Sequence, residues 1–130
     1  MNKTAVLVDG AFYLKRAKFL FGPKAPKERA DELYAYCMRH LKEKELYRIF
    51  FYDCPPAQKT IYNPITKKSE NLMKTPQFAW SNDFHKHLVT KRKIALRMGE
   101  LLETTAGYVL KPDSLKNLLQ KKITVDDLTK

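Results

Sequence analysis

The stretch TAVLVDG, residues 4–10, decides the fold of this chain. A short apolar run rich in β-forming residues stops abruptly at Asp9-Gly10, which is typical of a buried strand that delivers a carboxylate to its carboxyl end. Apolar residues at helical spacing follow at once from Ala11 to Phe21, and Gly22-Pro23 ends them. The opening therefore predicts a strand, a tight turn and a helix.

The same ending recurs further along the chain. Pro26 opens a second helix, which apolar spacing extends to about His40. Residues 47–52, YRIFFY, then form a second strand that stops at Asp53, before two prolines that prevent both strand pairing and helix. Two strands therefore each end in an aspartate.

The second half of the chain is less regular. Residues 57–77 mix prolines, asparagines and lysines, and are predicted to form a basic loop with room for a short helical piece. Ser81 or Asn82 is expected to cap a helix that runs to about Lys91, and residues 94–102 are expected to form the third strand. Residues 108–110 either extend that strand or pair with it.

Near the end, Asp113 or Ser114 is expected to cap a short helix, and residues 125–128 begin a further element. The order strand, helix, helix, strand, helix, strand argues for an α/β fold whose sheet is mainly parallel. Such sheets place ligands at the carboxyl ends of their strands. Asp9 and Asp53 both belong there.

Composition limits the kinds of protein that this chain can be. Its 130 residues, 44% of them hydrophobic, suffice for a single domain, 1–130. No apolar run is long enough for a membrane span or a signal peptide, so we expect no membrane partner and a cytoplasmic location. The formal net charge of +11 makes nucleic acid the natural partner, although a surface tuned for solubility is the alternative.

Three sequence blocks occur in an order found in one protein family. They are VLVDGAFY at 6–13, RIFFYDCPP at 48–56 and LRMGEL at 96–101. With them the chain resembles bacterial NYN-domain proteins of the LabA-like (DUF88) group, which belong to the PIN-like nucleases. The resemblance runs from Thr4 to about Leu102, and more loosely over 124–128. It implies a Rossmann-like, three-layer fold and cleavage of RNA that depends on Mg²⁺ or Mn²⁺.

The resemblance also assigns residues. It implies that Asp9 is the first metal-binding, catalytic aspartate, and it places Asp53 at a strand end near the metal; Phe12 replaces an asparagine common in the family. The family's remaining acids lie in a lysine-glycine-valine-aspartate motif and a serine-glycine-aspartate-serine-aspartate motif, which this sequence lacks. We therefore expect an incomplete domain, without its C-terminal portion, that binds metal weakly and cleaves little by itself.

Local roles compete with these assignments. Asp9 can form a turn and cap the next helix, and Asp53 can form an Asx-type turn before Pro55. His85 and His87 are expected to be surface residues, because a spacing of two on a helix points them to different faces.

Basic residues provide the candidate nucleic-acid contacts. Aromatic residues among them, Tyr62, Phe78 and Trp80, are suited equally to base stacking and to packing. The basic candidates for phosphate contact, each of which a solvated surface also explains, are Lys67, Lys68, Lys74, Lys86, Lys91, Arg92, Lys93 and Arg97.

Two functions remain open for the chain. One is a ribonuclease domain whose other half is absent here or supplied by another chain. The other is a module that binds RNA or assembles without cleaving. A remnant without any activity is a third alternative. An incomplete sheet would expose an edge and an apolar face. We therefore expect a homo-oligomer or a complementing chain as a partner.

Overall fold

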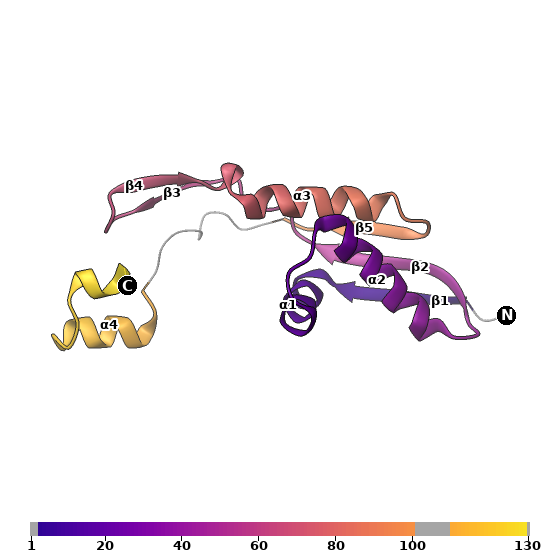
Figure 1. The fold of residues 1–130 in the computed structure, drawn as a ribbon, viewed down its shortest axis with the longest axis horizontal. Helices are drawn as coiled ribbons and strands as arrows, with labels where there is room; N and C mark the ends of the chain where they lie inside the picture. Colours follow the sequence, from indigo (N-terminus) through magenta and orange to yellow (C-terminus); the bar gives the residue numbers. More distant parts are fainter. Residues whose placement is uncertain (1–2, 101–109, 130) are drawn as a thin grey trace. The chain divides into compact units, whose positions relative to one another are not determined.

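The computed structural model describes residues 3–100 and 110–129. The chain divides into two compact units, residues 1–57 with 74–101 and residues 58–73 with 102–130. We call the described part of the first, residues 3–57 and 74–100, the main unit. It carries the sheet and the three long helices (Figure 1).

The sheet of the main unit is parallel and has three strands. These are β1 (Lys3–Asp9), β2 (Glu45–Asp53) and β5 (Ile94–Met98), in the order β1-β2-β5. The predicted α/β class, the parallel sheet and the positions of all three strands are confirmed. β1 is an edge strand with alternating exposure, so the expectation that it is a buried strand is wrong.

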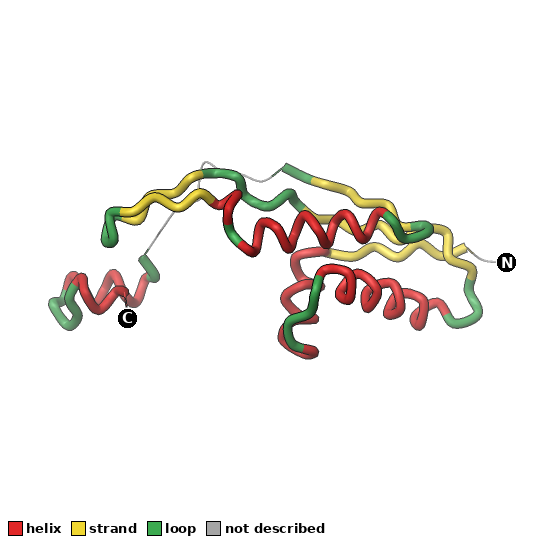
Figure 2. Tube along the Cα trace, turned by 45° about the horizontal axis from the view of Figure 1, so that its top comes forward, coloured by secondary structure: helices red, strands yellow, loops and turns green. Residues whose placement is uncertain are grey.

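The helices of the main unit all pack on one face of this sheet. They are α1 (Gly10–Phe21), α2 (Pro26–Leu41) and α3 (Pro76–Val89). The Phe51 ring on β2 meets Tyr13 of α1 edge-on at 6.5 Å and Phe84 of α3 at 5.6 Å, and Leu33 of α2 shares the same core. Figure 2 shows these helices on one side of the strands. The expected three layers are therefore two in the main unit.

The strands alternate between this covered face and an open face. On β2, Ile49 and Phe51 are fully buried, whereas Arg48 and Tyr52 are exposed. A register shift between Thr4 and Ala5 leaves one residue of β2, Tyr47, without a partner on β1. Such a bulge puts two successive side chains on one face, which explains why Tyr47 and Arg48 are both exposed.

The start of α3 differs from the prediction. The helix begins at Pro76, and the Thr75 hydroxyl caps it by accepting a hydrogen bond of 3.2 Å from the Phe78 amide. The expected cap at Ser81 or Asn82 is wrong, because proline at the first helical position is already set for a helix and needs no amide donor. This earlier start fixes which residues of α3 meet the sheet.

The basic loop predicted for 57–77 contains a β-hairpin instead. Strands β3 (Thr60–Asn63) and β4 (Lys68–Asn71) pair antiparallel, and the Asn63 side chain accepts hydrogen bonds from the amides of Ile65 and Thr66 in the turn. The expected short helical piece is present after it, as the 3₁₀ helix Leu72–Lys74. Asparagine is common in loops, and here its side chain closes the turn of a hairpin.

Two further elements lie in the C-terminal region. Helix α4 (Pro112–Leu119) follows Lys111 without a side-chain cap, so Asp113 and Ser114 lie in its first turn rather than capping it; a 3₁₀ helix spans Val125–Thr129. Strand β5 ends at Met98, so the strand expected at 94–102 is too long at Gly99 and Glu100. Its last two residues, and 108 and 109 of the strand expected at 108–110, lie outside the described residues.

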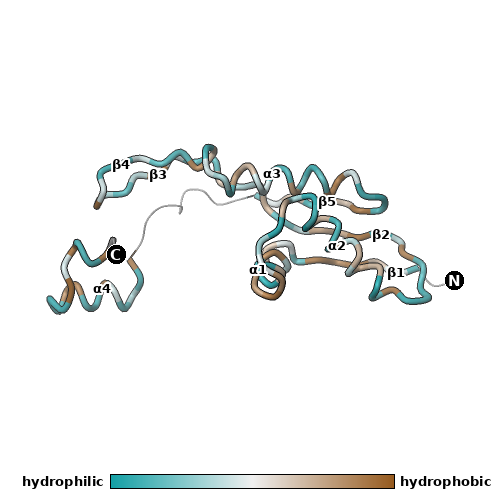
Figure 3. The backbone as a smooth tube through the Cα atoms, in the orientation of Figure 1, coloured by the Kyte–Doolittle hydropathy of each residue, from teal (hydrophilic) through white to brown (hydrophobic). Residues whose placement is uncertain are grey.

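Hydropathy follows the packing. Figure 3 shows hydrophobic residues along β1, β2 and α1, whereas the β3–β4 hairpin is largely hydrophilic. Every helix in residues 3–100 and 110–129 falls short of the length and apolar character that a membrane span requires.

Candidate functional site

The carboxyl edge of the sheet brings the two predicted aspartates to one depression. Asp9 is level with Tyr52 across β1 and β2, and Tyr52 is level with Arg97 across β2 and β5. An open depression of about 610 Å³ is lined by Asp9, Ala11, Tyr52, Asp53, Cys54, Pro55, Pro56, Ala57, Arg97 and Gly99. The expectation that both aspartates lie at this edge is met.

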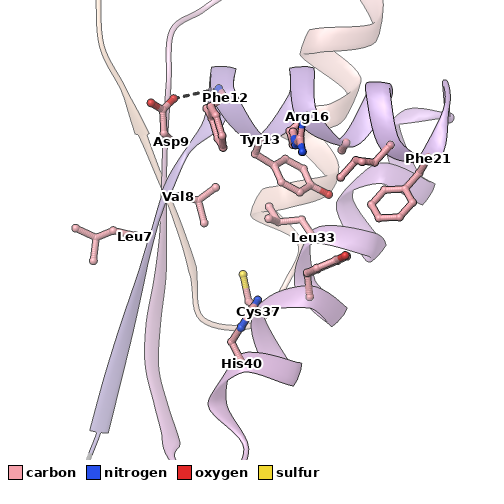
Figure 4. Close-up of a pocket in the computed structure, with 13 residues that line it drawn as sticks. Leu7, Val8, Asp9, Phe12, Tyr13, Arg16, Phe21, Leu33, Cys37 and His40 are labelled. Atoms are coloured by element: carbon pink, nitrogen blue, oxygen red, sulfur yellow. Dashed lines mark hydrogen bonds between the residues drawn. The ribbon is translucent and has the colours of Figure 1, made fainter.

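Asp9 is used as a helix cap. Its Oδ1 accepts a hydrogen bond of 3.2 Å from the Phe12 amide, the contact drawn as a dashed line in Figure 4. Gly10 is required by close approach, since a Cβ there would lie 2.6 Å from Cε1 of Phe51 and 2.6 Å from the Tyr52 carbonyl oxygen. The local role of the Asp-Gly pair, turn and cap, is therefore present in the structure.

Asp53 is held by two donors. Its Oδ1 accepts from the Cys54 amide at 2.8 Å, and its Oδ2 lies 2.8 Å from Nε2 of His85 on α3. His85 is only 8% exposed, so the expectation that it is a surface residue is wrong. A helix that starts at Pro76 turns Phe84, His85 and Leu88 toward the sheet. The sequence signal for a buried His85 is its position directly after Phe84, which is four residues from Leu88 and so on the same face of the helix.

The described residues do not fit the implied Mg²⁺ or Mn²⁺ site. Such an ion is held by several oxygen ligands, with water filling the remaining positions. In residues 3–100 and 110–129, no three His, Cys, Asp or Glu side chains are grouped so that they could hold a metal. Asp9 is engaged with Phe12, and both oxygens of Asp53 have donors. These two carboxylates are too few ligands for the metal-dependent cleavage of RNA that the family resemblance implies.

The basic candidates belong to several different elements. Lys67 and Lys68 belong to the hairpin, with Lys67 in its turn at a φ of 61°, and Lys74 ends the 3₁₀ helix that follows. Lys86 is exposed on α3. The structure therefore does not gather these four lysines on one element.

The dense basic run splits between the two ends of β5. Lys91 is paired with Asp31, and Lys93 Nζ donates to the Leu46 carbonyl oxygen at 2.9 Å. These residues and the exposed Arg92 precede the strand, whereas Arg97 lies near its carboxyl end. Of this run, Arg97 alone lines the depression.

Packing explains one of the three aromatic candidates. The Trp80 ring stacks on Phe84 with centroids 5.2 Å apart and planes 12° apart, and its Nε1 donates to the Lys24 carbonyl oxygen at 2.9 Å. Trp80 therefore anchors the loop between α1 and α2. Tyr62 is exposed on the hairpin, and Phe78 is half-buried on α3.

The open face of the sheet carries aromatic residues that the sequence analysis did not single out. Tyr47 and Phe50 lie with ring centroids 6.5 Å apart. The Arg97 guanidinium lies 5.4 Å from the Phe50 centroid, and that of Arg48 lies 6.0 Å from the Tyr47 centroid. In a strand, every second side chain points to the same face, so Arg48, Phe50 and Tyr52 of YRIFFYD share one face. That alternation is the sequence signal for this surface.

An apolar groove lies along β1 on the covered side. It measures about 330 Å³ and runs between β1, α1 and α2, where Figure 4 shows Val8, Phe12 and Cys37. Burial raises the pKa of the Cys37 thiol above its ordinary value, so that side chain is a packed apolar group.

Comparison of the chain with protein-family models, with curated proteins and with solved structures found no match.

Proposed function

We propose that this protein binds single-stranded RNA on the open face of its sheet. The observation that carries the proposal is the pair of arginine–aromatic contacts there, Arg97 on Phe50 and Arg48 on Tyr47. Purely parallel sheets are normally covered on both faces. In the main unit, one face presents Leu7 65% exposed, Tyr47 51% exposed and Tyr52 46% exposed.

The chemistry of this face suits unpaired nucleotides. Aromatic rings on a sheet stack on bases, and arginine both stacks and binds phosphate. Bases within a duplex already stack on one another, so the preference is for single strands. Asp9 shares the row of Tyr52 and Arg97 at the carboxyl end of the face, and Glu45 lies at the opposite end, so Arg48 is the basic residue between them. The net charge of +11 raises the rate of encounter with any polyanion.

Binding, rather than hydrolysis, is the proposed activity of this chain. Metal-dependent cleavage of RNA needs carboxylates that hold the ion and position the attacking water. The two aspartates at the carboxyl edge are occupied by Phe12, Cys54 and His85. A ribonuclease would require acids from a complementing chain, as the family resemblance suggests.

Self-association through β1 is a second proposal. Among the strands of the main unit, β2 pairs with one edge of β1, and the other edge has no strand beside it. An unpaired edge next to exposed apolar residues favours strand pairing between copies. We expect light scattering to show a dimer or larger species, and a monomer at high concentration would refute this arrangement.

The binding proposal is tested with a fluorescently labelled 12-nucleotide RNA and fluorescence anisotropy. Replacing Phe50 and Tyr52 together by alanine should weaken single-strand binding by about tenfold or more, because each lost base stack is worth roughly 1–3 kcal/mol. Binding of the wild type should weaken with rising salt and should favour the single strand over a duplex of the same sequence.

The chain offers a matched control. On α1 the Arg16 guanidinium lies 5.6 Å from the centroid of the exposed Phe19 ring, so it is the same kind of pair on a helix. Phe19→Ala should change RNA affinity by less than about twofold, and Arg97→Gln should weaken binding more than Arg16→Gln. Equal losses from both pairs would show that charge alone attracts RNA and would refute the open-face site.

A further inference from the structure

A second pocket of the main unit lies among the helices. It measures about 390 Å³ and opens between α1, the loop that follows it and the start of α3. Its lining residues are Leu14, Lys15, Lys18, Pro23, Lys24, Arg29, Gln77 and Trp80. The volume lies within the roughly 300–1,000 Å³ of small-molecule sites. None of these residues belongs to the open face of the sheet.

Four of the eight lining residues are cationic and none is acidic. Arg29 is only 2% exposed, and its Nη1 binds Oε1 of Glu32 at 2.8 Å while its Nη2 donates to the Gly22 carbonyl oxygen. Lys24 Nζ binds Oε2 of the same carboxylate at 2.6 Å. Glu32, which does not itself line the pocket, therefore binds both Lys24 and Arg29 and holds these two lining side chains in place.

Lys15 and Lys18 supply the remaining charge. They are three residues apart on α1, a spacing that places side chains next to each other on one side of a helix. Like charges at that spacing repel each other. A dianion between their ammonium groups would remove that repulsion and gain charge-assisted hydrogen bonds from both. This is the chemistry of a phosphate monoester.

The aromatic side of the pocket is rigid. Trp80 lines it, while Phe84 supports the indole by stacking and the Lys24 carbonyl oxygen accepts from its Nε1. A ring held in this way loses little conformational freedom when a flat ligand stacks on it. A planar base and a phosphate are both present in a nucleotide.

We propose that this pocket binds a nucleoside monophosphate, with the phosphate on Lys15 and Lys18 and the base against Trp80. Two sources carry this chemistry, a free nucleotide and the terminal 5′-phosphate of an RNA strand. The site lies among the helices, so it does not depend on RNA binding at the open face.

Trp80 is the only tryptophan in the sequence, so its emission reports on this pocket directly. Adenosine 5′-monophosphate, adenosine and inorganic phosphate are titrated against the full chain, with calorimetry on the same samples. The monophosphate should change the emission and bind at least about tenfold more tightly than adenosine or phosphate, because it alone engages both sides of the pocket.

Matched variants locate the phosphate. The double variant Lys15→Gln with Lys18→Gln should weaken monophosphate binding by about tenfold or more. The control, Lys42→Gln with Lys44→Gln, removes the same charge from exposed positions that do not line the pocket and should leave monophosphate binding unchanged. Equal losses in the two doubles, equal binding of adenosine, or no binding by calorimetry would each overturn the proposal.

The two sources are separated with oligonucleotides. A strand with a 5′-phosphate should change Trp80 emission more than the same strand with a 5′-hydroxyl if RNA ends are the ligand, and equally if the ligand is a free nucleotide. The variant with alanine at Phe50 and Tyr52 should keep the full response to the monophosphate. Loss of that response would show that the two sites are one and would overturn the inference.

Discussion

Phe50 and Phe51 are neighbours in the chain and lie on opposite faces of the same sheet. Phe51 has no exposed surface and contacts rings from α1 and α3. Phe50 is partly exposed, beside Tyr47 and under Arg97. One face thus uses aromatic residues to hold the fold, and the other presents them. The difference teaches that an apolar run in a strand can combine a core with a binding surface.

The largest expected effect breaks the covered face. Phe51→Ala should lower the free energy of unfolding by about 3–5 kcal/mol, because it removes a fully buried ring and leaves a cavity. Phe50→Ala should cost less than about 1 kcal/mol, since its ring is partly in water already. Urea unfolding followed by circular dichroism measures both. Similar costs at the two positions would mean that the open face is also covered.

The next effect compares an ionic group among the helices with one on the open face of the sheet. Glu32, among the helices, accepts hydrogen bonds from Tyr13 at 2.8 Å, Lys24 and Arg29. Glu32→Gln should cost about 1.5–3 kcal/mol, because it leaves the buried Arg29 without a charged partner. Arg97→Gln on the open face should change stability by less than about 0.5 kcal/mol. Thermal unfolding at neutral pH tests the difference.

The pH dependence of stability follows from the same cluster. Burial acts to raise the pKa of Glu32, but the hydrogen bonds from its three donors outweigh burial and hold that pKa below the ordinary value of 4.5. Because the folded-state pKa is depressed, this contribution is complete above about pH 4.5 and is lost as the pH falls through the folded-state pKa. Glu32→Gln should flatten the loss of stability on acidification, and an unchanged acid profile would contradict this role.

A smaller effect tests the close packing of Gly10 against β2. Gly10→Ala should cost about 1–3 kcal/mol, because the added methyl would collide with Phe51 and with the Tyr52 backbone. Gly99→Ala is the matched control at the same edge, where a Cβ lies 3.5 Å from Sγ of Cys54 and 3.8 Å from the Asp53 carbonyl oxygen. It should leave stability unchanged or raise it by up to about 1 kcal/mol.

The smallest effect separates the two roles of Asp9. Asp9→Ala should cost about 1 kcal/mol by removing the cap of α1, whereas Asp9→Asn should keep the cap and cost a few tenths. Millimolar Mg²⁺ or Mn²⁺ should leave the melting temperature of the wild type unchanged. A rise in melting temperature with either metal, lost in Asp9→Asn, would restore the metal site.

The elements were largely predictable, and their ends were not. Apolar spacing placed β1, β2, β5, α1 and α2 within a few residues, because hydrophobic periodicity is a local property. The hairpin at 60–71 is not predicted in this way because its strands carry almost no apolar pattern, and α3 begins earlier than predicted because Thr75-Pro76 forms its start. Side-chain hydrogen bonds of Asn63 in the hairpin turn and of Thr75 at the helix cap stabilise these two elements locally.

The candidate site was half predictable. The positions of Asp9 and Asp53 followed from strands that end in an acid within a parallel sheet. That His85 lies against Asp53 depends on the phase of α3, which is set 9 residues earlier at Pro76. The three pockets and the contact of Arg97 with Phe50 join residues distant in sequence, so no local pattern predicts them; only the pair Tyr47 and Arg48 is local.

The sequence by itself determined that this chain forms parallel strands with crossover helices and that acids stand at the strand ends, because alternation, helical spacing and proline act over a few residues. Only the tertiary structure decided which face of the sheet the helices cover. That choice depends on the side to which all three helices cross, and it turns Phe51 into core and leaves Phe50 as surface.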